Sequence, residues 1–298
     1  MKLFWLLATV SSFLFSYELK PLKINPTTYC FIGDTAPVNK ENGGFVSNMC
    51  LVKSDTDIIA IDAGPTYEFA RQLNEKAVQL FHHPITKVVL TNYHDDRVIG
   101  ASYFQKHNIP IYAEKSITEV IAQNDIRFQR IQREVGEKLY QNSFIPTAFT
   151  LIDTQFDLTK NIEIRKLSSA ANSATDLIVY DKQTKTLFAG NIVFNDRALG
   201  YFPDSDVNGW LKAIDTIKTF NATAIVGGHG KQFDSKSYLT TERYLQAMKQ
   251  QIPALYDQDV GLDKVVGKCD FSEFRNLSHF QELNGKNIYN YYMQVERE

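Results

Sequence analysis

Apolar runs rich in β-branched residues alternate along this chain with stretches in which apolar residues recur at helical spacing. The runs predict strands at residues 29–32, 45–52, 58–61, 85–90, 109–113, 148–152, 162–167, 177–180, 186–189 and 222–228. Helical spacing predicts helices at residues 66–81, 97–108, 115–141, 207–220 and 235–256. This alternation of strands and helices is typical of an α/β protein.

The order of these elements fits a four-layer αββα sandwich, in which two mixed β-sheets pack face to face with helices outside. The predicted fold class is therefore α/β (α+β). With 298 residues and 44% hydrophobic content, the chain can bury one large core. No linker interrupts it, so we expect one domain at residues 17–256. The polar, aromatic-rich residues 257–298 are expected to form a C-terminal extension, for which the sequence predicts no definite structure.

The N-terminus has the layout of a secretory signal peptide. Lys2 precedes an apolar stretch from Leu3 to Phe15, which is followed by the small residue Ser16. This stretch is short for a membrane span, and we expect cleavage near Ser16 to remove residues 1–16. The mature protein is then periplasmic or secreted, with no stable membrane span. An uncleaved anchor or a buried first helix is the alternative.

Charge and cysteine content narrow the function classes. The net charge is −2, from 32 basic and 34 acidic residues without long runs, so the sequence gives no indication of nucleic-acid binding. Cys30 and Cys50 lie in apolar, strand-like runs, where cysteine is usually a small buried hydrophobe. We therefore expect them to be reduced, with a bridge between them as the alternative. No C-x-x-C pair is present, which argues against a thiolate zinc site.

Unusual polar residues follow several predicted strands, where α/β proteins place functional groups. The segments are DAGP with Asp62, TNYHDDR with Asn92, His94, Asp95, Asp96 and Arg97, SSAANSATD with Asn172, GNIVFND with Asn191, and VGGHGK with His229. Imidazole and carboxylate groups together bind zinc, and their close spacing lets His94 and Asp96 point into one pocket. Glycines beside His229 would let the backbone come close to a ligand.

Taken together, the DAG turn, a T-x-x-H-x-D motif opening a helix, a later AGN turn and a final GGHG resemble the metallo-β-lactamase fold superfamily. The resemblance covers residues 27–255. Members usually carry T-H-x-H-x-D-H, a His in a later G-H-T-x-G-D segment, a metal-bridging Asp and a final G-H. Three of these positions are kept, as His94, Asp96 and His229. Four are changed, to Asn92, Arg97, Asn172 and Asn191.

The changed positions limit what the resemblance implies. A two-metal site needs about three protein ligands for each ion, and amide oxygens are poor zinc donors. The NYHxDR segment is similar to a single-zinc subclass with Asn and Arg at the same places. That similarity implies one weakly held zinc on Asp96, His229 and Asn191, with His94 as a further candidate ligand.

The resemblance also implies catalytic roles. His94, if free of metal, would act as a general base on water, and Asp96 would work with the metal. Arg97 would balance nearby carboxylates or clamp an anionic substrate. Asp95 either supplies a missing carboxylate or caps the helix that follows, and we favour the cap. Asp62 is chiefly structural in the family.

Two functions remain open from the sequence. The first is an exported hydrolase that acts on a small ester, thioester or lactam-like substrate through a single weakly held zinc. The second is a catalytically impaired pseudoenzyme that serves as a periplasmic binding or accessory protein. Asn92, Asp95 and Asn172 would then contact substrate or be vestigial. The expected partner is a small molecule, and a protein partner is not identified by any motif.

Overall fold

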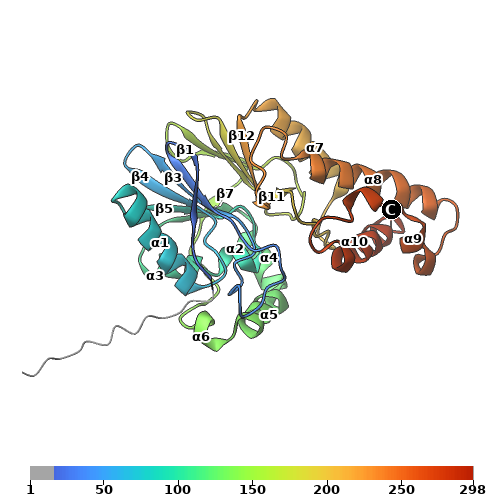
Figure 1. Ribbon diagram of the computed structural model, residues 1–298, viewed down its shortest axis with the longest axis horizontal. Helices are drawn as coiled ribbons and strands as arrows, with labels where there is room; N and C mark the ends of the chain where they lie inside the picture. Colours follow the sequence, from blue (N-terminus) through green and yellow to red (C-terminus); the bar gives the residue numbers. More distant parts are fainter. Residues whose placement is uncertain (1–16, 298) are drawn as a thin grey trace, which may run out of the picture.

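The computed structural model describes residues 17–297, so the expected signal peptide at residues 1–16 lies outside the described part (Figure 1). Two mixed β-sheets form the centre of the molecule. The first has seven strands in the order β1 to β7, with antiparallel pairing as far as β4 and parallel pairing after it. Its strands are β1 (Pro21–Asn25), β2 (Thr28–Phe31), β3 (Met49–Ser54), β4 (Asp57–Ile61), β5 (Lys87–Val89), β6 (Ile111–Glu114) and β7 (Thr150–Ile152).

The second sheet has five strands in the order β12-β11-β10-β9-β8. Only the pair of β11 and β12 is parallel. The strands are β8 (Gln155–Asp157), β9 (Ile162–Arg165), β10 (Ile178–Asp181), β11 (Thr186–Phe194) and β12 (Ala224–His229). One buried cluster, which includes Val52, Val89 and Phe188, joins the facing sides of the two sheets.

Helices cover the outer faces of both sheets, so the predicted four-layer sandwich is confirmed. Helices of the first half pack with the first sheet: α1 (Tyr67–Phe81), α2 (Asp95–Val98), α3 (Ala101–Lys106), α4 (Ile117–Gln123), α5 (Asp125–Val135) and α6 (Glu137–Tyr140). Helices α7 (Val207–Thr219) and α8 (Leu239–Tyr256) pack against the second sheet. Helix α1 shows how sequence sets these elements, since Thr66 caps it by accepting from the Phe69 N–H.

Two sequence predictions need correction. The single helix predicted at residues 115–141 is three helices, because Asn124 ends α4 and Gly136, at φ 83°, ends α5. The strand predicted at residues 45–52 begins only at Met49. Residues 45–48 form a buried loop instead, and their carbonyl groups are thereby free to contact the candidate site.

The C-terminal segment, for which the sequence predicts no definite structure, is folded. It forms α9 (Leu262–Lys268), the 3-10 helix η1 (Ser272–Phe274) and α10 (Phe280–Val295). Its apolar side chains join the core beneath α8, and in Figure 1 it lies beside α8 at the end of the molecule. Asn287 of α10 donates to the Leu199 carbonyl and accepts from the Tyr201 N–H, which fixes the loop after β11. Among the described residues, no helix is long and apolar enough to cross a membrane.

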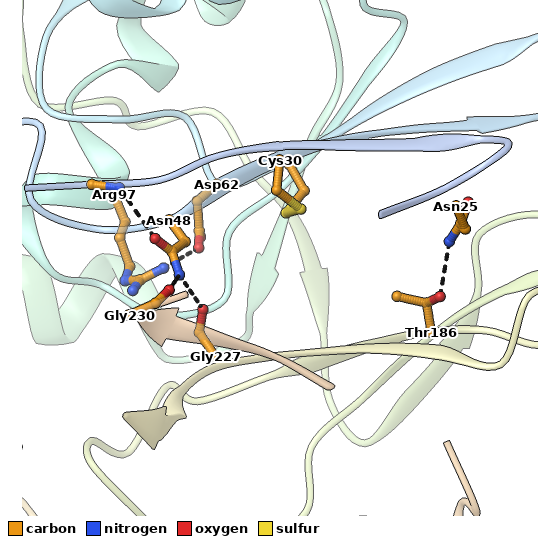
Figure 2. Close-up of a disulfide and its surroundings, with 10 residues drawn as sticks. Asn25, Cys30, Asn48, Asp62, Arg97, Thr186, Gly227 and Gly230 are labelled. Carbon is orange, nitrogen blue, oxygen red and sulfur yellow. Dashed lines mark hydrogen bonds and ion pairs between the residues drawn. A yellow bond between two sulfur atoms is a disulfide. The ribbon is translucent and has the colours of Figure 1, made fainter. Parts of the chain in front are cut away.

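The prediction that Cys30 and Cys50 are reduced is wrong, because the structure contains a disulfide between them (Figure 2). They are direct partners across the antiparallel pair of β2 and β3, with their Cα atoms 4.0 Å apart. Strand register brings them together, and register is not visible in the spacing of two cysteines. The bridge is buried between the two sheets.

Removing this bridge should lower stability. The bridged residues are separated by 20 positions in sequence, and a loop of this length restricts the unfolded chain by about 3 kcal/mol. We expect the double variant Cys30→Ala, Cys50→Ala to unfold at lower urea concentration, with a free energy of unfolding reduced by roughly that amount. Reductant should shift the natural chain in the same direction. The control is Cys269→Ser, since Cys269 is a free thiol. An unfolding midpoint that neither change moves would contradict the bridge.

Candidate functional site

A cavity of about 350 Å³ opens where strands of both sheets end. The structure brings five of the sequence-predicted residues around it: His94, Asp95, Asp96, Asn191 and His229. The other side of the cavity is formed by residues that the sequence analysis does not identify: Arg127, Arg130, Arg197, Phe202, His279, Glu282, Leu283 and Lys286. No sequence signal marks these residues, because the helices and loops that carry them meet only in the folded chain.

Below the cavity lies a buried ion pair between Arg97 and Asp62. Arg97 is 0% exposed, and its second guanidinium nitrogen donates to Asn191 Oδ1 at 2.7 Å and to the Gly228 carbonyl at 3.0 Å. Asp62 also accepts from the N–H and hydroxyl of Thr91. Figure 2 shows Asp62 and Arg97 close to the Gly227–Gly230 segment. This arrangement agrees with the structural role that the resemblance implies for Asp62.

The proposed clamp role of Arg97 requires correction. Its side chain does not line the cavity, and its donors are already bonded to protein groups, so it cannot bind a substrate there.

The interpretation of the glycines beside His229 also changes. Gly228 permits close approach, but a Cβ there would meet Arg97 and Asn191 rather than a ligand.

The amide of Asn191 determines the protonation of His94. Asn191 Oδ1 accepts from Arg97, so Nδ2 is the end that faces His94 Nδ1 at 3.0 Å. His94 Nδ1 must therefore accept, and the neutral ring carries its proton on Nε2. Burial, together with Arg127, lowers the pKa of His94 well below 6.5, so this neutral form persists. The buried Nε2–H has no partner among the described residues.

His229 has the opposite tautomer. Its Nδ1 lies 2.7 Å from the Val46 carbonyl, which can only accept, so Nδ1 carries the proton and Nε2 keeps a lone pair. The ring stacks on Phe194 with centroids 4.7 Å apart. Burial and the nearby Arg197 lower the pKa of His229 well below 6.5. The loop at residues 45–48 thus orients one side of the site.

The two neighbouring aspartates have different environments. Burial raises the pKa of Asp96, but Arg97, with a smaller contribution from Arg127, outweighs burial and keeps the pKa below its usual value, so Asp96 is ionised. Asp95 does not cap the helix, which corrects the favoured prediction, because α2 begins at Asp95 and has no side-chain cap. Asp95 instead pairs with Arg127 at 3.3 Å and Arg130 at 3.2 Å.

Asn92 and Asn172 lie behind the cavity and are both 0% exposed. Asn92 donates to Asp176 and accepts from the His94 N–H. Asn172 donates to the Gly200 carbonyl and accepts from Asn191. Neither side chain lines the cavity, so neither contacts a substrate there. Burial raises the pKa of Asp176, which the sequence analysis does not identify, to about 7.

These contacts test whether the site suits zinc. Structural zinc usually has four ligands, and catalytic zinc has three protein ligands and water. In residues 17–297, no group of three or more His, Cys, Asp or Glu side chains is placed to hold a metal ion. The Asn191 oxygen is occupied by Arg97, and His94 presents an N–H. Asp96 and His229 are left, so the expected set of ligands does not fit zinc.

Comparison with known proteins agrees with this fold. The family model described as "Metallo-beta-lactamase superfamily" matches residues 42–229, which is more than half of the chain. The chain belongs to this superfamily. The predicted resemblance is therefore confirmed. The family is typically zinc-dependent, in contrast to the donor set described above.

Two relatives are named "Metallo-beta-lactamase type 2". The protein from Bacteroides fragilis is 22% identical over 154 residues, which cover 50% of this chain and 55% of its own length. This chain thus spans little more than half of that relative. The protein from Bacillus sp. (strain 170) is 22% identical over 199 residues, which cover 65% of this chain and 71% of its own length.

Solved metallo-β-lactamases share the fold. The DIM-1 structure has a TM-score of 0.62 at 19% identity, covering 77% of this chain and 98% of its own. The mono-zinc form of FIM-1 from Pseudomonas aeruginosa has a TM-score of 0.61 at 18% identity, covering 76% of this chain and 94% of its own. About a quarter of this superfamily member is therefore additional to the shared fold.

Replacing Arg97 should destabilise the protein strongly. Arg97→Met would leave Asp62 buried without its cation, and such a loss typically costs about 3–5 kcal/mol. We expect urea denaturation to show a decrease of that size, and Asp62→Asn in the same chain to recover part of it. Arg133→Met, at an exposed position, is the control and should leave the midpoint unchanged. Similar midpoints for Arg97→Met and the control would contradict a stabilising role for the ion pair.

The His94 tautomer can be observed directly. In protein labelled with ¹⁵N at histidine, we expect the His94 ring to carry its proton on Nε2, because Asn191 donates to Nδ1. The ring should stay neutral below pH 6.5, where a free imidazole becomes protonated, because burial lowers its pKa. His83, which is exposed, has its Nδ1 near the Pro84 carbonyl and serves as the internal comparison. A His94 proton on Nδ1, or titration near 6.5, would contradict this assignment.

Proposed function

We propose that this protein is an exported member of the superfamily that binds a small molecule in its cavity without using zinc. It corresponds to the pseudoenzyme alternative, a periplasmic binding or accessory protein. The observation that carries the proposal is the position of the Asn191 amide, which accepts from Arg97 and donates to His94. Two expected ligands are thereby engaged with protein groups.

Electrostatics give further support. A zinc ion beside Asp96 would add two positive charges where several cations already surround the carboxylate. Arg97 and Arg127 both help to lower the pKa of Asp96, so its charge is already compensated. A metal would have to compete with these fixed cations while holding only Asp96 and His229, and weak affinity follows.

The cavity itself supports a binding role. Its volume of about 350 Å³ is in the range of small-ligand pockets. Its walls combine aromatic rings such as Phe194 and Phe202 with charged groups such as Asp96 and Arg197. Apolar walls with a few convergent polar groups are the usual composition of a ligand site.

Export is part of the proposal. The disulfide between Cys30 and Cys50 supports it, because such bridges persist in oxidising compartments and are rare in the cytosol. The signal-peptide layout of residues 1–16 points to the same location, namely periplasmic or secreted.

One arrangement favours the alternative, a hydrolase of a small ester, thioester or lactam-like substrate with a single weakly held zinc. Asp96 and His229 line the same cavity, and the Val46 carbonyl orients the His229 ring so that Nε2 keeps its lone pair. Metal-bound histidines commonly donate the N–H of the ring nitrogen that does not bind the metal to a backbone carbonyl. This alternative requires further ligands from water or substrate.

Zinc titration distinguishes the two functions. We expect purified mature protein to take up no stoichiometric zinc under mild excess, as measured by calorimetry and metal analysis. The triple variant Asn92→His, Asn172→His, Asn191→Asp should bind zinc more tightly, because imidazole and carboxylate replace three amides. Hydrolysis of a chromogenic ester or β-lactam should be assayed for both.

The control for this experiment is the triple variant carrying also His229→Ala, which removes one of the two zinc ligands left in the natural chain. Circular dichroism would verify that each variant is folded. One equivalent of zinc in the natural chain, with hydrolysis that a chelator abolishes, would reject the proposed function in favour of the hydrolase.

A further inference from the structure

We propose that the cavity binds a small carboxylate that carries a neighbouring hydroxyl or ammonium group, with the carboxylate held by Arg197 and His94. The proposal rests on the proposed function, since it needs this space to be free of zinc. It specifies the ligand class of the same site. Two donors that lack protein partners, on His94 and Arg197, and two acceptors, on Asp96 and His229, determine that class.

Arg197 is the first unsatisfied donor. Burial lowers the pKa of Arg197. The guanidinium nevertheless stays charged, because arginine does not lose its proton in proteins. Its Nε has no partner, and its Nη1 lies 3.4 Å from His229 Nδ1, which cannot accept because its proton is already given to Val46. Within residues 17–297, no carboxylate forms an ion pair with it. The residue is partly exposed, but the Nε–H is shielded from water without an acceptor, which is unfavourable, and an anionic ligand would remove that penalty.

His94 is the second unsatisfied donor. Its Nε2–H is buried and unpartnered, and the residue lines the same cavity as Arg197. The two donors come from different strand ends, after β5 and after β11. Nearby, Arg127 and Arg130 are already paired with Asp95, so they compete less for the ligand. An oxyanion can accept hydrogen bonds from both the charged Arg197 guanidinium and the neutral His94 ring.

Asp96 and His229 supply the matching acceptors. The Asp96 carboxylate makes no hydrogen bond among the described residues, and His229 Nε2 keeps its lone pair because Nδ1 donates to the Val46 carbonyl. A ligand with a hydroxyl or ammonium group next to its carboxylate would satisfy acceptors and donors together. Inorganic phosphate would direct anionic oxygens toward these acceptors as well as toward the donors, which favours a carboxylate that carries a separate donor group.

The C-terminal helix limits the size of the ligand. His279, Leu283 and Lys286, at the start and along α10, form one wall of the cavity. Asn287 of the same helix bonds the loop that carries Gly200, so this wall is fixed to the site. The cavity of about 350 Å³ is near the lower limit for ligand pockets, which favours a compact molecule.

Calorimetry on the mature full chain, in buffer with a chelator that has no carboxylate group, tests the inference. The probes are acetate, glycolate, glycine and inorganic phosphate. We expect glycolate or glycine to bind more tightly than acetate, and phosphate to bind least. Arg197→Gln should weaken binding by about tenfold or more, because a charge-assisted hydrogen bond is lost. Arg133→Gln is the matched control, since it removes the same charge at an exposed position and should leave the affinity unchanged.

Arg197→Lys provides a second variant if Arg197→Gln does not fold, and it should retain intermediate affinity because it keeps the charge. The inference is overturned if none of the three carboxylates binds, if phosphate binds most tightly, or if the Arg197 variants bind as the natural chain does. These failures are separate from failure of the proposed function. Stoichiometric zinc uptake rejects the metal-free function, whereas a metal-free chain that binds no carboxylate rejects only this inference.

Discussion

The buried pair of Arg97 and Asp62 is the interaction on which the site depends. A guanidinium and a carboxylate taken out of water are stable only if nearly all of their hydrogen-bonding groups find partners. Both terminal nitrogens of Arg97 are partnered, and only its Nε is not: they bind the end of β4 through Asp62, β11 through Asn191 and β12 through the Gly228 carbonyl. One side chain from the start of α2 therefore connects strands of both sheets at the place where they form the cavity.

The same pair determines which atom of His94 donates into the cavity, because each hydrogen bond from Arg97 onward fixes the direction of the next. Because Arg97 can only donate, Asn191 must turn its oxygen toward it and its nitrogen toward His94. His94 then accepts on Nδ1 and presents an N–H from Nε2. His229, oriented independently by Val46, presents a lone pair. A cation at the base of the site thus changes the neighbouring imidazole from a potential metal ligand into a donor.

The sequence predicts the fold of this molecule better than the contacts that individual side chains make within it. Strand ends and polar loops were predictable because apolar runs and turn residues are local features, and the family motifs occur in order. The bridge of Cys30 with Cys50 depends on the register of β2 and β3, and the role of Arg197 depends on a loop held by Asn287. Arg97 shows the limit most clearly. Its charge suggests substrate binding, whereas its complete burial assigns it to the protein interior.

The four changed motif positions behave as one unit rather than as separate losses. Asn191 joins Arg97, His94 and Asn172, and Asn92 joins His94 to Asp176. Each of the three amides is bonded through both its nitrogen and its oxygen. Random loss of metal ligands would leave buried polar groups without partners, and such groups are costly. The amides leave no such group, whereas two unpartnered donors, on His94 and Arg197, lie at the cavity, where a ligand can satisfy them.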